Sequence, residues 1–131
     1  MIEICNAESD SECAPKKWGK ELILHNNSDY CGKLLKFKKG AKFSMHFHIK
    51  KSETWYVNKG IFLLRFIDPD DATTYEEKIT EGTVVEIGRG DPHQLIALTE
   101  GEIFEVSTQH FDDDSYRIEK GDSQLNQEKT E

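Results

Sequence analysis

Residues 40–60 read Gly40-Ala-Lys-Phe-Ser-Met-His46-Phe-His48-Ile-Lys-Lys-Ser-Glu53-Thr-Trp-Tyr-Val-Asn-Lys-Gly60. Two histidines separated by one residue point to the same face of a strand, because side chains alternate along an extended chain. A turn after His48 would fold Glu53 back beside them. Two imidazoles and a carboxylate that converge while leaving coordination positions open are typical of a divalent metal site.

A third imidazole lies farther along the chain. It ends the stretch Gly82-Thr-Val-Val-Glu-Ile-Gly-Arg-Gly-Asp-Pro-His93, directly after a turn rich in glycine and proline. We expect this side chain to be the fourth ligand. The spacing leaves the metal open among Zn, Mn, Fe, Ni and Co. The predicted ligands are His46, His48, Glu53 and His93.

The rest of the chain predicts an all-β domain. Short runs of β-branched and aromatic residues alternate with clusters of glycine, asparagine and aspartate, a spacing typical of a barrel or sandwich. No stretch keeps a 3.6-residue apolar period over three turns. The expected strands cover residues 21–25, 32–38, 42–48, 54–58, 61–67, 74–79, 83–87, 94–98 and 102–108.

The length of 131 residues fits a single domain. We expect a polar arm over residues 1–15, a barrel over 16–118 and a polar tail over 119–131. No apolar run reaches the roughly 20 residues that cross a bilayer, and the start lacks the features of a signal peptide. These features predict a soluble, cytoplasmic protein with no membrane partner. The three cysteines are widely spaced and predict reduced thiols rather than a disulfide framework.

The net charge of −8 argues against nucleic acid as a partner. The charge is unevenly distributed: residues 14–65 hold 12 of the 17 Lys and Arg against 3 acids, whereas residues 66–131 hold 5 against 18. Two interpretations remain open. The basic half favours a small anionic ligand, or it is a lysine-rich surface balanced by the acidic half.

With both histidine stretches in view, the chain resembles a small single-domain cupin. The first cupin motif, G-x5-H-x-H-x3-4-E-x6-G, is complete from Gly40 to Gly60. The second, G-x5-P-x-G-x2-H-x3-N, is met at Gly82, Gly90 and His93, but Gly88 replaces its proline and Ala97 its asparagine. The resemblance implies a double-stranded β-helix (jelly-roll) barrel with the metal inside it.

Within the cupins, the nearest likeness is to the mannose-6-phosphate isomerase-like (type II) group. It is carried by residues 17–21, by 44–57 and by 105–119, where Asp113-Asp114-Ser-Tyr-Arg117 is similar to the group's ending. The likeness implies aldose–ketose proton transfer on a sugar phosphate, in which the metal polarises the substrate. The sequence does not identify the general base.

Strand alternation from the histidines suggests further site residues. It places Ser44 inside the barrel and Lys50 near its mouth, with Trp55 and Val57 on the inward face beside the glutamate. We predict substrate contacts from Ser44, Lys50 and Arg89, and the likeness to the group's ending adds Arg117, whose guanidinium suits a phosphate. The plainer interpretation makes the three cations surface charges or ion-pair partners.

Two other functions stay open: a non-catalytic or regulatory carbohydrate-binding cupin, and an Fe(II)-dependent dioxygenase. Trp18 and Trp55 are expected to pack rather than to stack on sugar. We also expect a homodimer, because Tyr56 should face away from the interior, beside the apolar run 61–67.

Overall fold

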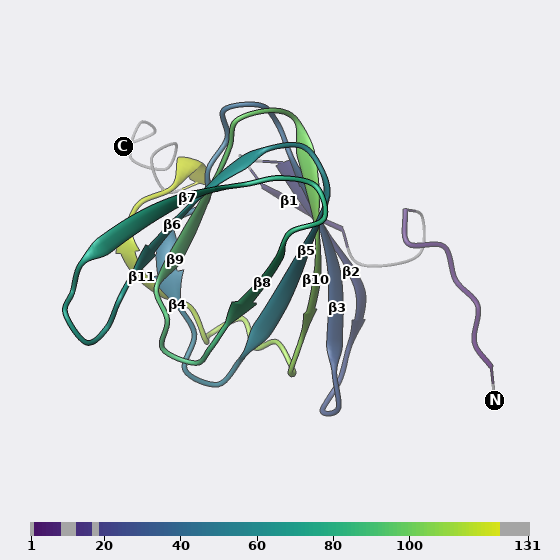
Figure 1. The fold of residues 1–131 in the computed structure, drawn as a ribbon. Coiled ribbons are helices and arrows are strands. Elements are labelled where there is room, and N and C mark those ends of the chain that lie inside the picture. The colour runs from purple at the N-terminus through teal and green to yellow at the C-terminus, as the bar shows by residue number, and fades with distance from the viewer. Residues whose placement is uncertain (1, 9–12, 17–18, 124–131) are drawn as a thin grey trace, which may run out of the picture.

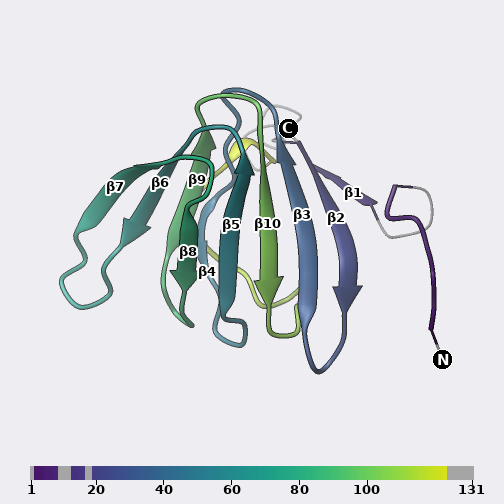
Figure 2. The same cartoon turned by 45° about the vertical axis from the view of Figure 1, so that its right-hand side comes forward.

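The structure is a computed structural model that describes residues 2–8, 13–16 and 19–123. Within these residues, eleven strands form two antiparallel sheets that face each other (Figures 1 and 2). The strands are β1 (Cys13–Lys16), β2 (Gly19–Asn26), β3 (Cys31–Phe37), β4 (Met45–Phe47), β5 (Glu53–Lys59), β6 (Phe62–Ile67), β7 (Thr74–Ile79), β8 (Val84–Ile87), β9 (His93–Ala97), β10 (Gly101–Ser107) and β11 (Tyr116–Glu119).

The order of the strands is that of a jelly roll. One sheet runs β1-β2-β3-β10-β5-β8 and the other β11-β4-β9-β6-β7. From β3 onward the chain passes to the opposite sheet at every connection except the β6–β7 hairpin. The expected all-β jelly-roll fold is therefore confirmed.

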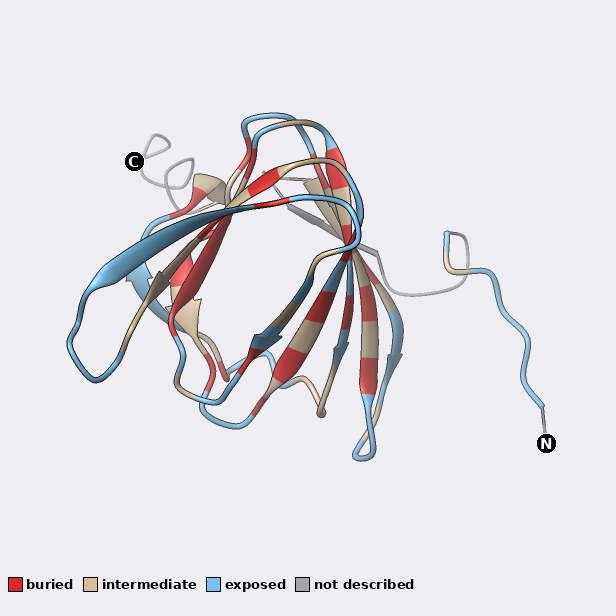
Figure 3. Cartoon of the chain, in the orientation of Figure 1, coloured by how far each residue is buried: buried red, intermediate tan, exposed pale blue. Residues whose placement is uncertain are grey.

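The interior is built by side chains that alternate along the strands. On β3, every second residue from Cys31 to Phe37 is buried, and β5 and β10 repeat the pattern (Figure 3). Trp55 and Val57 are buried together with Glu53, as predicted. The apolar core consists of Leu35, Phe37, Ala41, Phe43, Trp55, Val57, Phe62, Leu64, Ile79, Ile87, Leu95, Ala97 and Ile103.

Two motif glycines are needed for backbone reasons. Gly60 has a φ of 90°, and a Cβ there would lie 2.6 Å from the carbonyl oxygen of Glu100. Gly90 has a φ of 81°, and its amide donates a 2.7 Å hydrogen bond to the carbonyl oxygen of His48. Left-handed φ values and close backbone approach both favour glycine. The motif spacing therefore includes positions that shape the turns around the histidines.

The nine expected strands correspond to β2–β10, although 42–48 shortens to β4 plus an isolated bridge between Lys42 and Ile96. The sequence missed β1 and β11, which lie at edges of the two sheets. Edge strands need not bury one face, and all of β11 is exposed. Cys13–Pro15, expected in the N-terminal arm, pair with β2.

The start of the expected C-terminal tail also contacts the barrel. The Asp122 amide donates a hydrogen bond to the carbonyl oxygen of Lys42, and its carboxylate accepts one from the Lys42 amide. Residues 124–131 of that tail, and Trp18, lie outside the described residues. Among the described residues, no helix is both long and apolar enough to span a membrane.

Candidate metal centre

Three histidines meet between β4 and β9. His46 on β4 pairs directly with His93 on β9, and His48 follows β4 immediately. One ligand nitrogen from each of the three rings lies within 4.8 Å of the others. The ring centroids are 4.8 Å apart for His46 and His93 and 5.0 Å apart for His46 and His48. The structure therefore brings together the three predicted imidazole ligands.

Hydrogen bonds fix the orientation of each ring. His48 Nδ1 lies 2.6 Å from the carbonyl oxygen of Asp114, and His93 Nδ1 lies 2.8 Å from that of Asp91. A ring that donates its Nδ1–H to a carbonyl keeps its lone pair on Nε2. His46 Nδ1 lies 2.9 Å from the Ser44 hydroxyl oxygen. All three Nδ1 atoms are thus engaged, which leaves the Nε2 atoms for a cation.

His93 Nε2 in particular needs a partner. The side chain is only 2% exposed, and this nitrogen makes no hydrogen bond within the described residues. A buried polar atom without a partner is costly to leave unsatisfied. A divalent cation on Nε2 would satisfy it, and the three imidazoles fit Zn, Mn, Fe, Ni or Co.

Glu53 completes the predicted set at the start of β5. Its Oε1 lies 3.4 Å from His93 Nε2, and its Oε2 lies 3.8 Å from His48 Nε2. A second contact was not foreseen: the buried Lys51 places its Nζ 2.9 Å from Glu53 Oε2 and 3.2 Å from Glu105 Oε2. Oε2 therefore pairs with the lysine and lies near His48, while Oε1 faces His93.

Burial of the side chains strongly affects which groups of the site are charged. It is the largest cause that lowers the pKa of His93 to about 4, and it also holds the pKa of His46 well below its usual value. Both rings are therefore neutral at pH 7, the form that binds metal. Burial alone would lower the pKa of Lys51, but the carboxylates of Glu105 and Glu53 outweigh it and raise that pKa. This ammonium stays charged.

Three loops are joined at the end of the barrel beside the histidines. The Asp114 carboxylate accepts hydrogen bonds from the amides of Ile49, Lys50 and Lys51, so the segment after β10 holds the β4–β5 loop. Arg89 Nε donates a 2.9 Å hydrogen bond to the carbonyl oxygen of Lys50, which joins the β8–β9 loop to the same segment.

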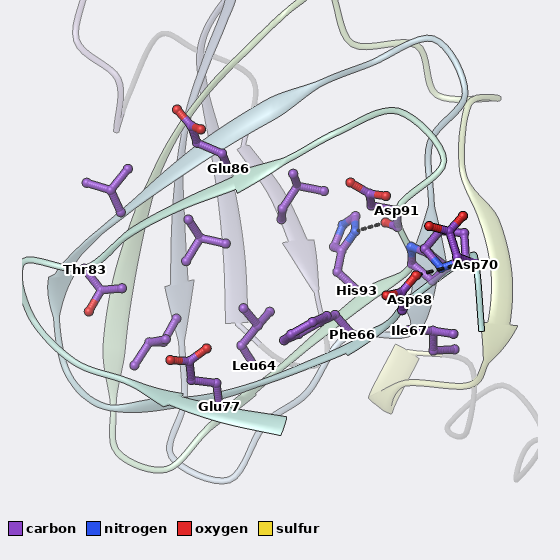
Figure 4. Close-up of a pocket in the computed structure, with 16 residues that line it drawn as sticks. Leu64, Phe66, Ile67, Asp68, Asp70, Glu77, Thr83, Glu86, Asp91 and His93 are labelled. Atoms are coloured by element: carbon purple, nitrogen blue, oxygen red, sulfur yellow. Dashed lines mark hydrogen bonds between the residues drawn. The ribbon is translucent and has the colours of Figure 1, made fainter. Parts of the chain in front are cut away.

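A cavity of about 710 Å³ opens beside the histidines, between the β6–β7 hairpin and β8 (Figure 4). His93 lies in its wall, next to Asp91. Volumes of this size hold small-molecule ligands. The lining consists of Leu64, Phe66, Ile67, Asp68, Pro69, Asp70, Glu77, Ile79, Thr83, Val84, Val85, Glu86, Ile87, Asp91, Pro92 and His93.

None of the predicted substrate contacts lines this cavity. Ser44 is buried and bonds to His46 instead. Lys50 is exposed, with its Nζ 4.8 Å from the centre of the Phe111 ring, and Arg89 is exposed on the neighbouring loop. Arg117 is exposed on the edge strand β11. Their contact with substrate stays a prediction.

Two residues at the site carried no recognisable signal in the sequence. Lys51 adjoins Lys50 in a run that reads as surface charge. Asp114 is the last of three consecutive aspartates and is 2% exposed. Only the fold shows that one of these lysines and one of these aspartates are buried beside the predicted metal ligands.

Comparisons with known proteins agree with the fold. The family model described as Cupin matches residues 25–126. Over 45 residues the chain is 36% identical to a mannose-1-phosphate guanylyltransferase of Salmonella muenchen, a match that covers 34% of this chain and 10% of that protein. The chain thus corresponds to a small part of this relative.

Solved structures are similar over most of the chain. Oxalate decarboxylase from Bacillus subtilis superimposes with a TM-score of 0.74 at 19% identity, over 90% of this chain and 33% of that one. CapF, a capsular polysaccharide assembling protein of Staphylococcus aureus, gives 0.71 at 21%, over 83% and 32%. At these identities the likeness shows the fold. Together with the match over residues 25–126, it establishes that the chain belongs to the cupin family.

Proposed function

We propose that this cupin is a metal-dependent sugar isomerase that moves a proton between the two carbons of a carbonyl–hydroxyl pair. The observation that carries the proposal is the convergence of His46, His48 and His93 beside a cavity large enough for a small sugar. The 45-residue similarity to a mannose-1-phosphate guanylyltransferase supports a carbohydrate ligand. It agrees with the likeness to isomerases in the sequence.

The three imidazoles and Glu53 would hold the cation. A bound divalent metal acts as a Lewis acid toward a carbonyl and its neighbouring hydroxyl. The chain's own residues provide a dry wall on one side, where the Phe43 ring lies 5.0 Å from His46 and the Trp55 ring lies 5.5 Å from His93. Phe43 and Trp55 are both buried, so this side is shielded from solvent and polar groups would act more strongly on a ligand.

Asp91 is the carboxylate best placed to move the proton. Its side chain lines the cavity beside His93, and its carbonyl oxygen is bonded to His93 Nδ1 (Figure 4). A carboxylate at a cavity wall can accept the proton from C2 and return it to C1, while the proton of the C2 hydroxyl passes to the carbonyl oxygen at C1. The Gly88 amide donates a 3.0 Å hydrogen bond to Asp91 Oδ2 and holds the side chain in place.

Proton NMR in D₂O tests the proposal. Mannose and mannose 6-phosphate would be incubated with protein loaded in turn with Zn²⁺, Mn²⁺ and Co²⁺. We expect ketose carrying solvent deuterium at C1 and, through the reverse reaction, aldose carrying it at C2. Neither ketose nor deuterium uptake with any metal would overturn the proposal. Asp91→Asn should abolish conversion while metal content is unchanged. Asp113→Asn, an exposed aspartate outside the cavity, should convert normally.

A second candidate is a carbohydrate-binding cupin without catalysis. It is favoured because the buried carboxylates Glu53 and Glu105 do not line the cavity and both contact the ammonium of Lys51, so catalysis would depend on an exposed cavity carboxylate such as Asp91. Sugar binding by metal-loaded protein without any deuterium exchange would select this candidate over the isomerase.

A further inference from the structure

The cavity beside His93 is built, except for Leu64, from the acidic half of the chain, residues 66–131. All of its lining lies between Leu64 and His93, and the lining contains no lysine or arginine. Its apolar part comes from inward-facing residues such as Leu64, Phe66 and Ile87. Its charged part consists of the five carboxylates Asp68, Asp70, Glu77, Glu86 and Asp91.

Glu77 is the cavity carboxylate whose inward position follows most directly from the strand register. It pairs with Leu64 across β6 and β7 and precedes the buried Ile79 by two residues, so it occupies an inner-face position. Its neighbour Glu76 faces the other way and pairs with Arg65 at 3.2 Å. No lysine or arginine of the described residues forms an ion pair with any of the five cavity carboxylates.

The cavity and the candidate metal centre share His93, whereas His46, His48 and Glu53 are not among the residues that line the cavity. The His93 side chain is 2% exposed, lines the cavity, and has its Nε2 without a hydrogen-bond partner in the described part of the chain. A ligand that occupied the cavity and contacted a cation on His93 would therefore lie beside the carboxylates. Their negative potential acts on the part of the ligand that remains away from the metal.

We infer that this site takes a sugar or polyol whose end away from the metal carries an ammonium group, and that it disfavours a phosphate there. That the ligand is a sugar or polyol rests on the proposed function, whereas its preferred charge is inferred from the residues that line the cavity. Carboxylates accept charge-assisted hydrogen bonds from an ammonium. Glu86 occupies an outer-face position on β8, between the inward-facing Val85 and Ile87. A phosphate beside the other four carboxylates, Asp68, Asp70, Glu77 and Asp91, would still meet like charge, which is a strong source of discrimination.

The lysines of the basic half do not reverse this preference. Lys33 pairs with Glu21 at 2.6 Å, and Lys51 pairs with Glu53 and Glu105. Lys50 and Arg89 lie outside the cavity lining. Of the two interpretations of the charge asymmetry, balance within the fold therefore fits better than attraction of an anion into the cavity.

Isothermal titration calorimetry on zinc-loaded protein tests the inference with three ligands that differ only at C6: 6-amino-6-deoxymannose, mannose and mannose 6-phosphate. We expect the amino sugar to bind at least about fivefold more tightly than mannose, and the phosphate to bind more weakly than mannose. Added NaCl should reduce both differences. Tightest binding by the phosphate, equal binding by all three, or no binding of the amino sugar would overturn the inference.

Two neighbouring substitutions separate the cavity from the surface. Glu77→Gln should reduce the preference for the amino sugar to less than about twofold, because it removes the inward carboxylate. Glu76→Gln removes the same charge from the opposite face of β7 and should keep the preference; equal effects of the two substitutions would overturn the inference. Calorimetry measures binding and does not require turnover. An amino sugar that binds as expected but shows no deuterium exchange would therefore contradict the isomerase proposal and leave the charge preference intact.

Discussion

Lys51 Nζ lies 2.9 Å from Glu53 Oε2, and both side chains are at most 5% exposed. This buried ammonium constrains the orientation of the predicted metal ligand Glu53. It fixes one oxygen of the carboxylate and leaves the other, Oε1, toward His93. The same ammonium neutralises Glu105, so it links β5 to β10 through charge as well as through the backbone.

Removal of this lysine should strongly destabilise the fold. Lys51→Met leaves Glu53 and Glu105 buried without a cation, and breaking a buried ion pair in this way costs about 3–5 kcal/mol. The free energy of unfolding from urea denaturation measures the loss. Lys50→Met alters the exposed neighbour and should cost less than about 1 kcal/mol. Equal losses for the two variants would show that Lys51 has no special role.

The Asp114 carboxylate should make stability depend on acid pH. Burial alone would raise the pKa of Asp114, but hydrogen bonds from the amides of Lys50, Ile49 and Lys51 outweigh it and lower that pKa. The stabilisation by this carboxylate is complete at pH values above the pKa of an unfolded aspartate, about 3.9. It is lost as the pH falls through the lower pKa that Asp114 has in the folded protein.

Asp114→Asn tests this dependence. The variant should be about 1–3 kcal/mol less stable at pH 7, and the difference from wild type should shrink below about pH 4. Thermal unfolding between pH 2 and 7 measures both effects. Asp113→Asn, at the exposed neighbour, is the control. A constant difference between Asp114→Asn and wild type across this range would be inconsistent with the lowered pKa.

The contact between Ser44 and His46 should tune metal affinity. Ser44→Ala removes the partner of His46 Nδ1 at a buried position, and loss of such an outer hydrogen bond weakens metal binding by about tenfold or more. Competition for Zn²⁺ with a chelating indicator measures the change. Ser107→Ala, whose hydroxyl bonds to the Thr108 carbonyl, should leave affinity unaltered. The same affinity in both variants would remove Ser44 from the site.

The fold and the imidazole cluster were predictable because both follow from strand alternation. His46 and His48 are two residues apart at β4, and His93 begins the next strand of the same sheet. Alternation fails beyond the strand. The chain leaves β4 after Phe47, so counting onward placed Lys50 at the mouth, whereas Lys51 is the lysine that turns inward.

Contacts between residues far apart in the sequence could not be predicted from local sequence patterns. Asp114 binds a loop 63 to 65 residues earlier in the chain, and only the jelly-roll topology brings the two segments together. The charge asymmetry was visible in the sequence, but its meaning was not. The topology places the acidic residues 64–93 around the cavity, and it pairs two basic side chains, Lys33 and Lys51, with buried or half-buried glutamates.

The expectation of a homodimer placed Tyr56 beside the run 61–67, but the structure puts them on different sheets, β5 in the larger and β6 in the smaller. A dimer surface that includes Tyr56 would instead lie on the outer face of the larger sheet. The strand register places Leu34, Phe104, Tyr56 and Val84 in one row, of which the last three are 37%, 46% and 60% exposed. We expect Tyr56→Lys to convert a dimer to monomers in sedimentation velocity, because a charge there would be buried without a partner. Tyr75→Lys, on β7, should stay dimeric. A monomeric wild type would disprove the prediction.

The metal content of purified protein tests the central claim most directly. After loading with Zn²⁺ and removal of excess, mass spectrometry of the dissolved metal should find about one zinc per wild-type chain and less than about a tenth in His46→Ala/His93→Ala. His25→Ala, outside the cluster, should retain wild-type zinc. Near-stoichiometric zinc in the double variant, or none in folded wild type, would contradict a metal centre at these histidines.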